Sequence, residues 1–330
     1  MVFQTKVITI FIVSNKKVNF FPLSSLSSEE NGYFCEVLNS ILMQIKELQD
    51  IASQVRRDIV RMVHGCKSGH PGGSLGCTDI LTALYFQQMK ISNRKGKGGY
   101  LSFKMEGHDE DLFFLSNGHI SPLFYSVLAR RGYFGVDELA TFRKIDSRLQ
   151  GHPTTHEGLP GIRVASGSLG QGLSVAIGAA LGKKLDGDPR TVYVLMGDGE
   201  QQEGQIWEAA QFAPHHKVDN LVGIIDLNFQ QIDGPTEKVM ANRDLKAKYK
   251  AFGWNVMEIK DGNNIEACIA GLRKAKRLTG KGQPVLILLH TEMGAGVDFM
   301  MGTHKWHGSA PNDEQLAKAL AQLPVTLGDY

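Results

Sequence analysis

The stretch that decides the fold is TVYVLMGDGEQQEGQIWEAAQFAPHHKVDNLVGIIDLNFQQIDG, residues 191–234. It contains two runs expected to be strands, 191–196 and 221–226, and the continuous apolar VLM within the first is typical of a strand that is covered on both faces. Between them, residues 205–213 have the length and composition of a helix. A strand, a helix and a second strand in this order predict a parallel pair joined by a right-handed crossover.

The same alternation continues on both sides of this unit. An amphipathic helix is expected from Ile45 to Gly65, because apolar residues recur every three or four positions. Thr78 can cap a helix through Met89, and Ser121-Pro122 can begin another. Further segments are expected as helices over 175–185, 244–252 and 265–278, and as strands over 254–259 and 284–290. The pattern predicts an α/β fold with a mostly parallel sheet flanked by helices.

The first 42 residues differ from the rest of the chain. They combine a short β-prone run, a lysine pair and a serine-rich stretch, without a helical period linked to a core. We expect residues 1–42 to be a poorly ordered N-terminal extension and 43–330 to form one catalytic domain. Met43 is the expected start of the functional chain. The apolar run 7–13 is too short to span a bilayer, and no small-residue cleavage site follows it.

Charge and cysteine content narrow the class of protein. The 330 residues include 36 Lys and Arg against 34 Asp and Glu, a formal net charge of +2. This balance gives no reason to expect a nucleic acid or an anionic membrane as a partner. Only four cysteines are present, scattered and without a CxxC pattern, so a cytoplasmic location is expected.

Polar residues follow both strands of the 191–234 unit. Asp198 lies in GDG (197–199), and Asn228 follows the second strand. The carboxyl ends of neighbouring parallel strands meet at one edge of a sheet, where open α/β folds bind ligands. A carboxylate and an amide oxygen suit Mg²⁺, and the glycines and the next helix start suit a diphosphate. GDG alone is also a common strand-to-turn junction, and Asn228 could be a turn residue, but their joint spacing favours the metal site.

Histidines give the second signal. Five of the eleven stand in glycine-rich or turn contexts: His70, His119, His152, His304 and His307. A single such histidine is most often a satisfied loop residue, whereas five suggest a convergent polar site able to transfer protons. A zinc site is the competing interpretation, because HxxH brings two imidazoles close together. No HExxH-type motif accompanies it, so zinc is the less favoured alternative.

Seven motifs occur in an order and spacing that resemble the amino-terminal domain of transketolases. They are SGHPGGSLG (68–76), LSNGHISPLFY (115–125), GHP (151–153), SGSLGQG (166–172), GDG with the following glutamate, NFQQIDG (228–234) and THKWHG (303–308). The resemblance runs from about Met43 to the C-terminus. It implies the thiamine diphosphate-binding fold, with thiamine diphosphate and Mg²⁺ or another divalent cation as cofactors.

The resemblance also implies roles for individual residues. The implied metal ligands are Asp198, Asn228 and the backbone carbonyl of Gln230. The implied cofactor contacts are His119, Gly167, Ser168, Leu169, Gly199 and Asn228. The implied catalytic residues are His70, His152 and His307, which would contact substrate oxygens, and Glu203, which would relay protons to the aminopyrimidine near a dimer interface. His304 matches a less certain neighbour.

Two departures from the family pattern matter. The chain ends at LGDY (327–330), whereas transketolases continue into a pyrimidine-binding domain and a third domain. The activating glutamate and most phosphate-binding arginines would belong to that missing part. The resemblance therefore implies a C-terminal partner subunit, in an α2β2 assembly, and no activity without it. In LNFQQID (227–233) the bulky Phe229 replaces the more usual glycine or arginine.

The sequence thus predicts the N-terminal subunit of a split transketolase of the pentose phosphate pathway. It would transfer a two-carbon ketol unit from a ketose phosphate, such as xylulose 5-phosphate, to an aldose phosphate, such as ribose 5-phosphate. Three alternatives remain: a subunit specialised for an unusual sugar phosphate, a deoxyxylulose-phosphate synthase, and a cofactor-binding subunit without turnover. The histidine motifs favour transketolase over the synthase, and the retained Asp198 and histidines disfavour the non-catalytic subunit.

Overall fold

The computed structural model describes residues 9–14, 17–22 and 28–330, with side chains over 43–96 and 98–330. The chain divides into two compact units, residues 1–47 and 48–330. In the first unit, β1 (Thr9–Ser14) and β2 (Lys17–Pro22) pair antiparallel.

Helix α1 (Ser28–Gly65) ends where it was predicted to end but begins earlier than Ile45. The early start has a simple cause, because no proline lies between Ser28 and Gly65 and a nucleated helix gains one hydrogen bond per added residue. Residues 1–42 were expected to be poorly ordered. Part of this segment, 1–8, 15–16 and 23–27, lies outside the described residues. For the described part of that segment the structure has β1, β2 and the start of α1, and the extension itself stays a prediction.

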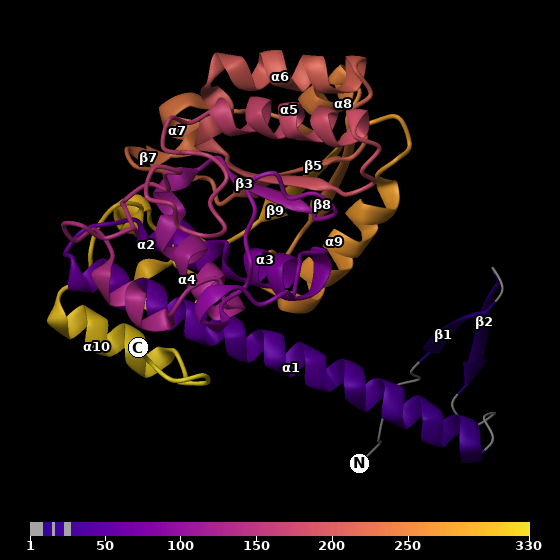
Figure 1. Ribbon diagram of the computed structural model, residues 1–330, viewed down its shortest axis with the longest axis horizontal. Helices are drawn as coiled ribbons and strands as arrows, with labels where there is room; N and C mark the ends of the chain where they lie inside the picture. Colours follow the sequence, from indigo (N-terminus) through magenta and orange to yellow (C-terminus); the bar gives the residue numbers. More distant parts are fainter. Residues whose placement is uncertain (1–8, 15–16, 23–27) are drawn as a thin grey trace. The chain divides into compact units, whose positions relative to one another are not determined.

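The second unit is built on a five-stranded parallel sheet (Figure 1). Its strands stand in the order β3 (Leu112–Leu115), β4 (Val192–Gly197), β5 (Leu221–Leu227), β9 (Val285–His290) and β8 (Asn255–Ile259). The central strands β4 and β5 are buried along almost their whole length, as the continuous apolar VLM of β4 predicted for that strand. The predicted class, a mostly parallel sheet flanked by helices, is confirmed.

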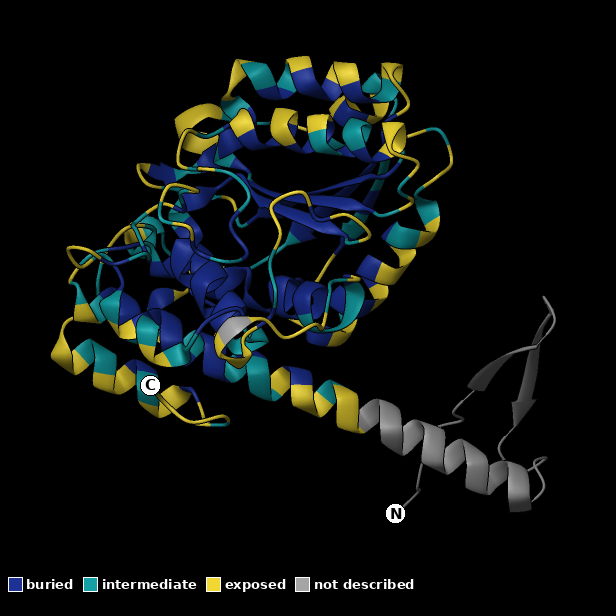
Figure 2. Ribbon diagram, in the orientation of Figure 1, coloured by how far each residue is buried: buried dark blue, intermediate teal, exposed yellow. Residues whose placement is uncertain are grey.

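Helices cover both faces of the sheet (Figure 1). One face carries α5 (Gln171–Leu185), α6 (Gly204–His215) and α8 (Leu245–Phe252), and the other carries α3 (Thr78–Ala83), α4 (Ser121–Arg131) and α9 (Ile265–Leu278). The helix surfaces turned toward the sheet are buried (Figure 2). The covering helices therefore enclose one apolar core on each side of the strands.

The strand order reverses once, and this reversal shapes the carboxyl edge. Helix α6 joins β4 to its neighbour β5, and α8 carries the chain onward to the edge strand β8. Helix α9 then brings the chain back to β9, between β5 and β8. Because parallel crossovers are right-handed, reversing direction moves the connecting helix to the opposite face. The loops that follow β3, β4, β5 and β9 all meet at the carboxyl edge of the sheet, the usual ligand site of such folds.

One local expectation was wrong, and one strand was missed. The helix expected from Thr78 to Met89 is present as α3 continued by a π-helical turn, η2 (Leu84–Gln88), and a further short helix, α2 (Pro71–Gly76), precedes it. The Thr78 hydroxyl does not cap a helix; it donates to the Ser74 carbonyl oxygen, at 2.9 Å. Strand β3 was not predicted, because its four apolar residues are too short a run to distinguish from a buried helix turn. The remaining regular elements include β6 (Gln230–Gln231), β7 (Gly234–Pro235), α7 (Thr236–Met240) and α10 (Asp313–Gln322).

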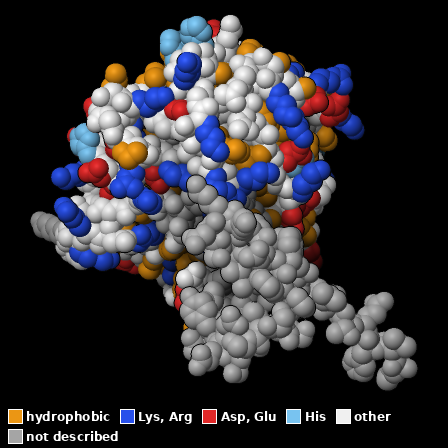
Figure 3. Space-filling view, turned by 90° about the vertical axis from the view of Figure 1, so that its right-hand side faces the viewer, with side chains coloured by type: hydrophobic (Ala, Val, Ile, Leu, Met, Phe, Trp, Pro, Cys, Tyr) orange, Lys and Arg blue, Asp and Glu red, His pale blue; other side chains and the backbone are white. Residues whose placement is uncertain are grey.

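The surface shows basic side chains distributed among acidic and apolar ones over the face displayed in Figure 3. In the part of the chain that the structure describes, no helix is both long enough and apolar enough to cross a membrane.

We predict that a chain beginning at Met43 unfolds with nearly the same free energy as the full chain. The physical reason is the position of the core boundary. Met43, Gln44, Lys46 and Glu47 are exposed, and the first buried residue of the second unit is Leu48, at 5% exposure. Urea denaturation followed by circular dichroism would measure the difference, expected to stay within about 0.5 kcal/mol. A loss of several kcal/mol, or an insoluble shortened chain, would show that residues before Met43 contribute core contacts.

Candidate functional site

Asp198 and the residues after β5 lie together at the carboxyl edge. Gly197, the last residue of β4, pairs with Asp226 of β5, so the segments that follow them leave the sheet side by side. The Asp198 carboxylate is buried, with Oδ1 accepting from the Gly199 N–H and Oδ2 from the Phe229 N–H, both at 2.7 Å. The carboxylate therefore ties the loop after β4 to the loop after β5.

A second buried carboxylate lies near Asp198. Burial, and then the negative charge of Asp226, raises the pKa of Asp198 to about 7. Burial also raises the pKa of Asp226. Two carboxylates buried this close repel each other when ionised, and a bound cation would relieve that repulsion. The charge distribution at this edge fits a divalent cation.

The Asn228 amide is held in one orientation. Its Nδ2 donates to Asp226 Oδ2 at 2.7 Å, while its Oδ1 accepts from the Gln230 N–H at 2.9 Å. Because the side-chain nitrogen of Asn228 is bonded to Asp226, the side-chain oxygen is the atom that is available to bind a metal ion. One carboxylate, one amide oxygen and a backbone carbonyl are hard ligands that fit Mg²⁺ with phosphate oxygens in further positions. Across the described part of the chain, no group of three His, Cys, Asp or Glu side chains is arranged to hold a metal ion.

A small cavity reaches the carboxylate from the side of β9. It measures about 260 Å³, and its lining includes Asp198, Phe229, Thr236, Asn242 and His290. The Thr236 hydroxyl donates to Asp198 Oδ2 at 3.3 Å, and the Asn242 amide donates to the Asp198 carbonyl oxygen at 2.6 Å. The backbone and side chain of Asp198 are therefore fixed by several partners around an open space.

Glu200 connects three segments beneath this edge. Its carboxylate accepts hydrogen bonds from the Ser116 hydroxyl after β3, from the Gly170 N–H at 2.7 Å and from the Gly197 N–H at 3.0 Å. The side chain is buried, and burial raises its pKa despite these bonds. Glu200 thereby fixes the loop 166–170 against the ends of β3 and β4.

The loop 166–170 carries three of the predicted cofactor contacts. Gly167 and Ser168 are exposed and Leu169 is partly buried. Gly167 has φ +130° and lies so close to the His152 ring that a Cβ there would be 3.1 Å from it. Only glycine adopts this conformation readily, so the glycine at position 167 allows the loop 166–170 and the His152 ring to approach each other.

Four histidine rings gather at the same edge. The His70 ring centroid lies 5.1 Å from that of His119, 5.6 Å from His307 and 6.5 Å from His152. His119 and His307 stack at 5.1 Å. These rings come from four separate loops, so the convergence that the glycine contexts suggested is present in the structure.

The histidine cluster adjoins the loop after β5. A Cβ on Gly308 would lie 3.5 Å from the His70 ring and 3.7 Å from Ile232 Cδ1. A Cβ on Gly197 would lie 3.9 Å from the Cβ of Asn117, two residues before His119. The imidazoles and the Asp198–Asn228 edge therefore belong to one continuous site.

This environment favours the neutral form of the imidazoles. Burial lowers the pKa of His70 to about 4, with further contributions from the neighbouring His307, Arg143 and His152. Burial is also the main cause that lowers the pKa of His119, His152 and His307. Burial therefore favours the neutral form of these rings at physiological pH.

Several buried polar atoms at this edge have no hydrogen-bond partner among the described residues. They are His70 Nδ1, Asn117 Oδ1, Ser166 Oγ, Gln230 Oε1 and His307 Nδ1. Unpaired buried polar atoms are uncommon, because each forfeits its hydrogen bond to water. Their concentration between the histidines and the loop after β5 is consistent with a polar ligand that would satisfy them.

Two other residues singled out from the sequence lie beside the cluster. Glu203 is exposed, immediately before α6, and a Cβ on Gly170 would be 2.8 Å from its Cβ. His304 lies in a 3-10 turn, η8 (His304–Trp306). Among the described residues it makes no ring contact with His70, His119 or His152, although its carbonyl oxygen accepts from the His307 N–H at 2.8 Å.

Sequence reasoning missed three residues that shape the site. Glu200 directly follows GDG. In the sequence, a glutamate whose buried carboxylate organises loops looks the same as an ordinary glutamate at the start of a helix. Asp226 ends a run of apolar residues, and that position was a usable signal. Arg143 lies in an irregular segment with no motif, and only its spatial position relates it to the histidines.

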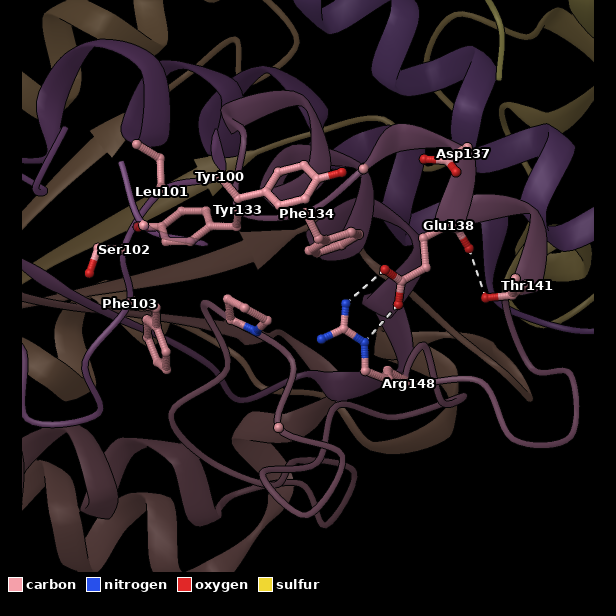
Figure 4. A pocket seen from close by; sticks show the side chains of 14 residues that line it. Tyr100, Leu101, Ser102, Phe103, Tyr133, Phe134, Asp137, Glu138, Thr141 and Arg148 are labelled. Carbon is pink, nitrogen blue, oxygen red and sulfur yellow. Dashed lines mark hydrogen bonds and ion pairs between the residues drawn. The ribbon is translucent and has the colours of Figure 1, made fainter. Parts of the chain in front are cut away.

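A separate hollow of about 690 Å³ lies away from these residues (Figure 4). Aromatic side chains, including those of Tyr133 and Phe134, line it together with the ion pair between Arg148 and Glu138, 2.7 Å. None of the predicted site residues lines this hollow.

Comparison with known proteins identifies what this chain resembles. A family described as "Transketolase, thiamine diphosphate binding domain" matches residues 48–326. The chain is 39% identical over 281 residues to one subunit of the apulose-4-phosphate transketolase of Phocaeicola vulgatus, covering 85% of this chain and 95% of that one. It is 38% identical over 277 residues to a 6-deoxy-6-sulfo-D-fructose transketolase subunit of a Clostridium species, covering 84% and 96%.

Solved structures agree with these matches. The transketolase of Campylobacter jejuni superposes with a TM-score of 0.76 at 33% identity, over 84% of this chain and 43% of that chain. The chain thus spans almost the whole of the two subunits and less than half of the Campylobacter transketolase chain.

We predict that Glu200→Ala lowers the free energy of unfolding by roughly 3 kcal/mol, because three donors, those of Ser116 and Gly170 buried and that of Gly197 partly buried, lose their acceptor. Urea denaturation of the isolated chain would measure the change. Glu208→Ala is the matched control, since Glu208 is an exposed residue of α6, and it should change stability by less than about 0.5 kcal/mol. Equal stabilities for the two variants would contradict the role assigned to Glu200.

Proposed function

The chain belongs to the transketolase family, and we propose that it acts as the thiamine diphosphate-binding subunit of a two-subunit transketolase. The observation that carries this proposal is the continuity of two features at one sheet edge. One is the buried carboxylate of Asp198 beside the oriented amide of Asn228, and the other is the group of four histidine rings. A cofactor with an anionic diphosphate and a reactive ring needs both kinds of contact.

The cation would be Mg²⁺ or a similar divalent ion. Asp198, the Asn228 amide oxygen and the Gln230 carbonyl would hold it, and diphosphate oxygens would complete its coordination. The loop 166–170, through Gly167, Ser168 and Leu169, would contact the cofactor together with His119 and Gly199. Support comes from the paired buried carboxylates, which favour a cation, and from the unpaired polar atoms between the loops.

Bound thiamine diphosphate would supply an electron sink for the two-carbon fragment. The chain's own task is then to bind the sugar, move protons and exclude water. His70, His152 and His307 are the proposed contacts to the sugar oxygens. Because their pKa values are lowered, they are neutral at pH 7 and can accept a proton from a hydroxyl group or donate a hydrogen bond to a carbonyl oxygen.

A partner subunit would complete the site. The relatives that this chain covers almost entirely are named as subunits, whereas it covers 43% of a single-chain transketolase. We propose a C-terminal, pyrimidine-binding subunit in an α2β2 assembly located in the cytoplasm. Its contact surface would include Glu203 and the exposed residues of loop 166–170, which lie together in front of α6. In that interface Glu203 would relay protons to the aminopyrimidine.

The proposed reaction is transfer of a two-carbon ketol unit from a ketose phosphate to an aldose phosphate. Xylulose 5-phosphate and ribose 5-phosphate, the substrates of the pentose phosphate pathway, are one candidate pair. The second candidate is a specialised sugar, favoured because the named relatives act on apulose-4-phosphate and on 6-deoxy-6-sulfo-D-fructose.

We predict that the purified chain alone shows no ketol transfer and gains it when a complementary pyrimidine-binding subunit is added. Transfer to ribose 5-phosphate would be followed in a coupled assay with xylulose 5-phosphate, apulose 4-phosphate and 6-deoxy-6-sulfofructose as alternative donors. His70→Ala and His307→Ala should each lower the reconstituted rate at least about 100-fold while cofactor still binds. His216→Ala, an exposed histidine after α6, is the control and should leave the rate unchanged. Robust turnover by the isolated chain would overturn the proposal.

A further inference from the structure

Arg143 lies between two of the loops that carry the histidine cluster. Its Nη1 donates to the Ser68 hydroxyl at 2.9 Å, two residues before His70. Its guanidinium also lies against Gly151, directly before His152, where a Cβ would be 2.8 Å from Cζ of Arg143. One side chain therefore touches the segments leading into both histidines.

The backbone holds Arg143 firmly in this position. Its φ is +58°, a left-handed conformation that costs a non-glycine residue free energy. Its N–H donates to the Leu149 carbonyl oxygen at 2.9 Å, which closes the loop 143–149. The preceding residue, Phe142, is buried, and a Cβ on Gly69 would lie 3.4 Å from its ring. Such a conformation persists only where several contacts enforce it, so the guanidinium has a fixed location.

The positive charge of Arg143 is not neutralised by a neighbouring carboxylate. Within the described residues it forms no ion pair, and its buried Nε has no hydrogen-bond partner. This distinguishes it from Arg148 of the same loop, which pairs with Glu138. A guanidinium stays charged in proteins, so its field acts on the groups around it.

The groups that face His70 from the neighbouring loops are Arg143, His119, His152 and His307, and none of them is acidic. For His152, burial is the main cause of the lowered pKa, and the positive charge of Arg143 is the second. The negative charge of Asp233 acts on His307, whose pKa it raises against the effect of burial. Arg143 is thus the one permanent cation that influences both His70 and His152 among the described residues.

We propose that Arg143 is a positioning residue that braces the His70 and His152 loops against each other and places an uncompensated positive charge near both rings. The proposal rests on the proposed function for the use of these rings in ketol transfer. The charge disfavours protonation of either imidazole, because an imidazolium would be repelled. Both rings then remain able to accept a proton from a sugar hydroxyl over a wider range of acidic pH.

The test begins with the isolated chain, so that its outcome does not depend on transferase activity. Imidazole titrations of His70 and His152 would be followed by NMR in Arg143→Met, Arg143→Gln and Arg143→Lys. Removing the charge in the Met and Gln variants should raise the pKa of both histidines, whereas Lys should keep them near the parent values. Lys144→Met is the control, since Lys144 is an exposed neighbour and should shift neither histidine. Gln retains a donor for Ser68, so it serves if the Met variant does not fold.

The reconstituted enzyme supplies the second readout. The acidic limb of the pH profile of kcat/KM should move to higher pH in Arg143→Gln, because the histidines protonate more easily. Arg143→Lys should keep the parent limb and still lose about 10-fold in rate, because an ammonium cannot reproduce the flat contact with Gly151. Unchanged histidine pKa values in Arg143→Gln would overturn the electrostatic role, and full activity of Arg143→Lys would overturn the bracing role. If reconstitution gives no activity, the proposed function fails while the NMR result still tests Arg143.

Discussion

The hydrogen bond from the Phe229 N–H to the Asp198 carboxylate is the contact on which the site depends. It joins the ends of two adjacent parallel strands, whose register already places Gly197 opposite Asp226. The bond fixes the carboxylate near Asp226, although burial disfavours ionisation of both carboxylates and the charge of Asp226 further disfavours that of Asp198. Such an arrangement stores an unfavourable electrostatic interaction in the free chain, and a cation would convert it into a binding site.

The loop after β5 shows how this arrangement is maintained. Phe229 has φ +59° and is 54% exposed, so a bulky residue occupies a left-handed conformation without being buried. Its N–H and carbonyl oxygen are both bonded, to Asp198 and to the Thr236 N–H. These two backbone hydrogen bonds therefore hold Phe229 in this conformation although its side chain is largely exposed.

The sequence predicted the parts of the fold that depend on continuous local patterns. β4 and β9 were foreseen because each contains a continuous apolar run, β5 because a mostly apolar segment follows the helix after β4, and α9 because a helix was expected over 265–278. β3 was missed because a four-residue run carries too little periodicity, and the π-helical turn η2 because its deviation is set by tertiary packing. The start of α1 was predicted at Ile45 instead of Ser28. The apolar helical period on which that prediction was based begins only where the core begins.

The residues of the candidate site also divide into those that local sequence patterns predicted and those that they did not. Residues in motifs, such as Asp198 and His70, were found because glycine and strand context restrict where they can lie. The lowered pKa of His70 was not foreseen, because it results from burial and from charges on other loops. Glu200 and Arg143 act through contacts that join segments distant in sequence, Ser116 to Gly170 and Ser68 to Gly151. No local pattern encodes such contacts.

Calorimetric titration of thiamine diphosphate into the chain, with and without Mg²⁺, tests the central claim most directly. For the unaltered chain we predict binding that requires the cation, because the diphosphate and the two buried carboxylates cannot share one site without it. In Asp198→Ala the Mg²⁺-dependent binding should be abolished while circular dichroism shows an intact fold. Unchanged cofactor affinity in Asp198→Ala would contradict the assignment of this sheet edge as the metal and diphosphate site.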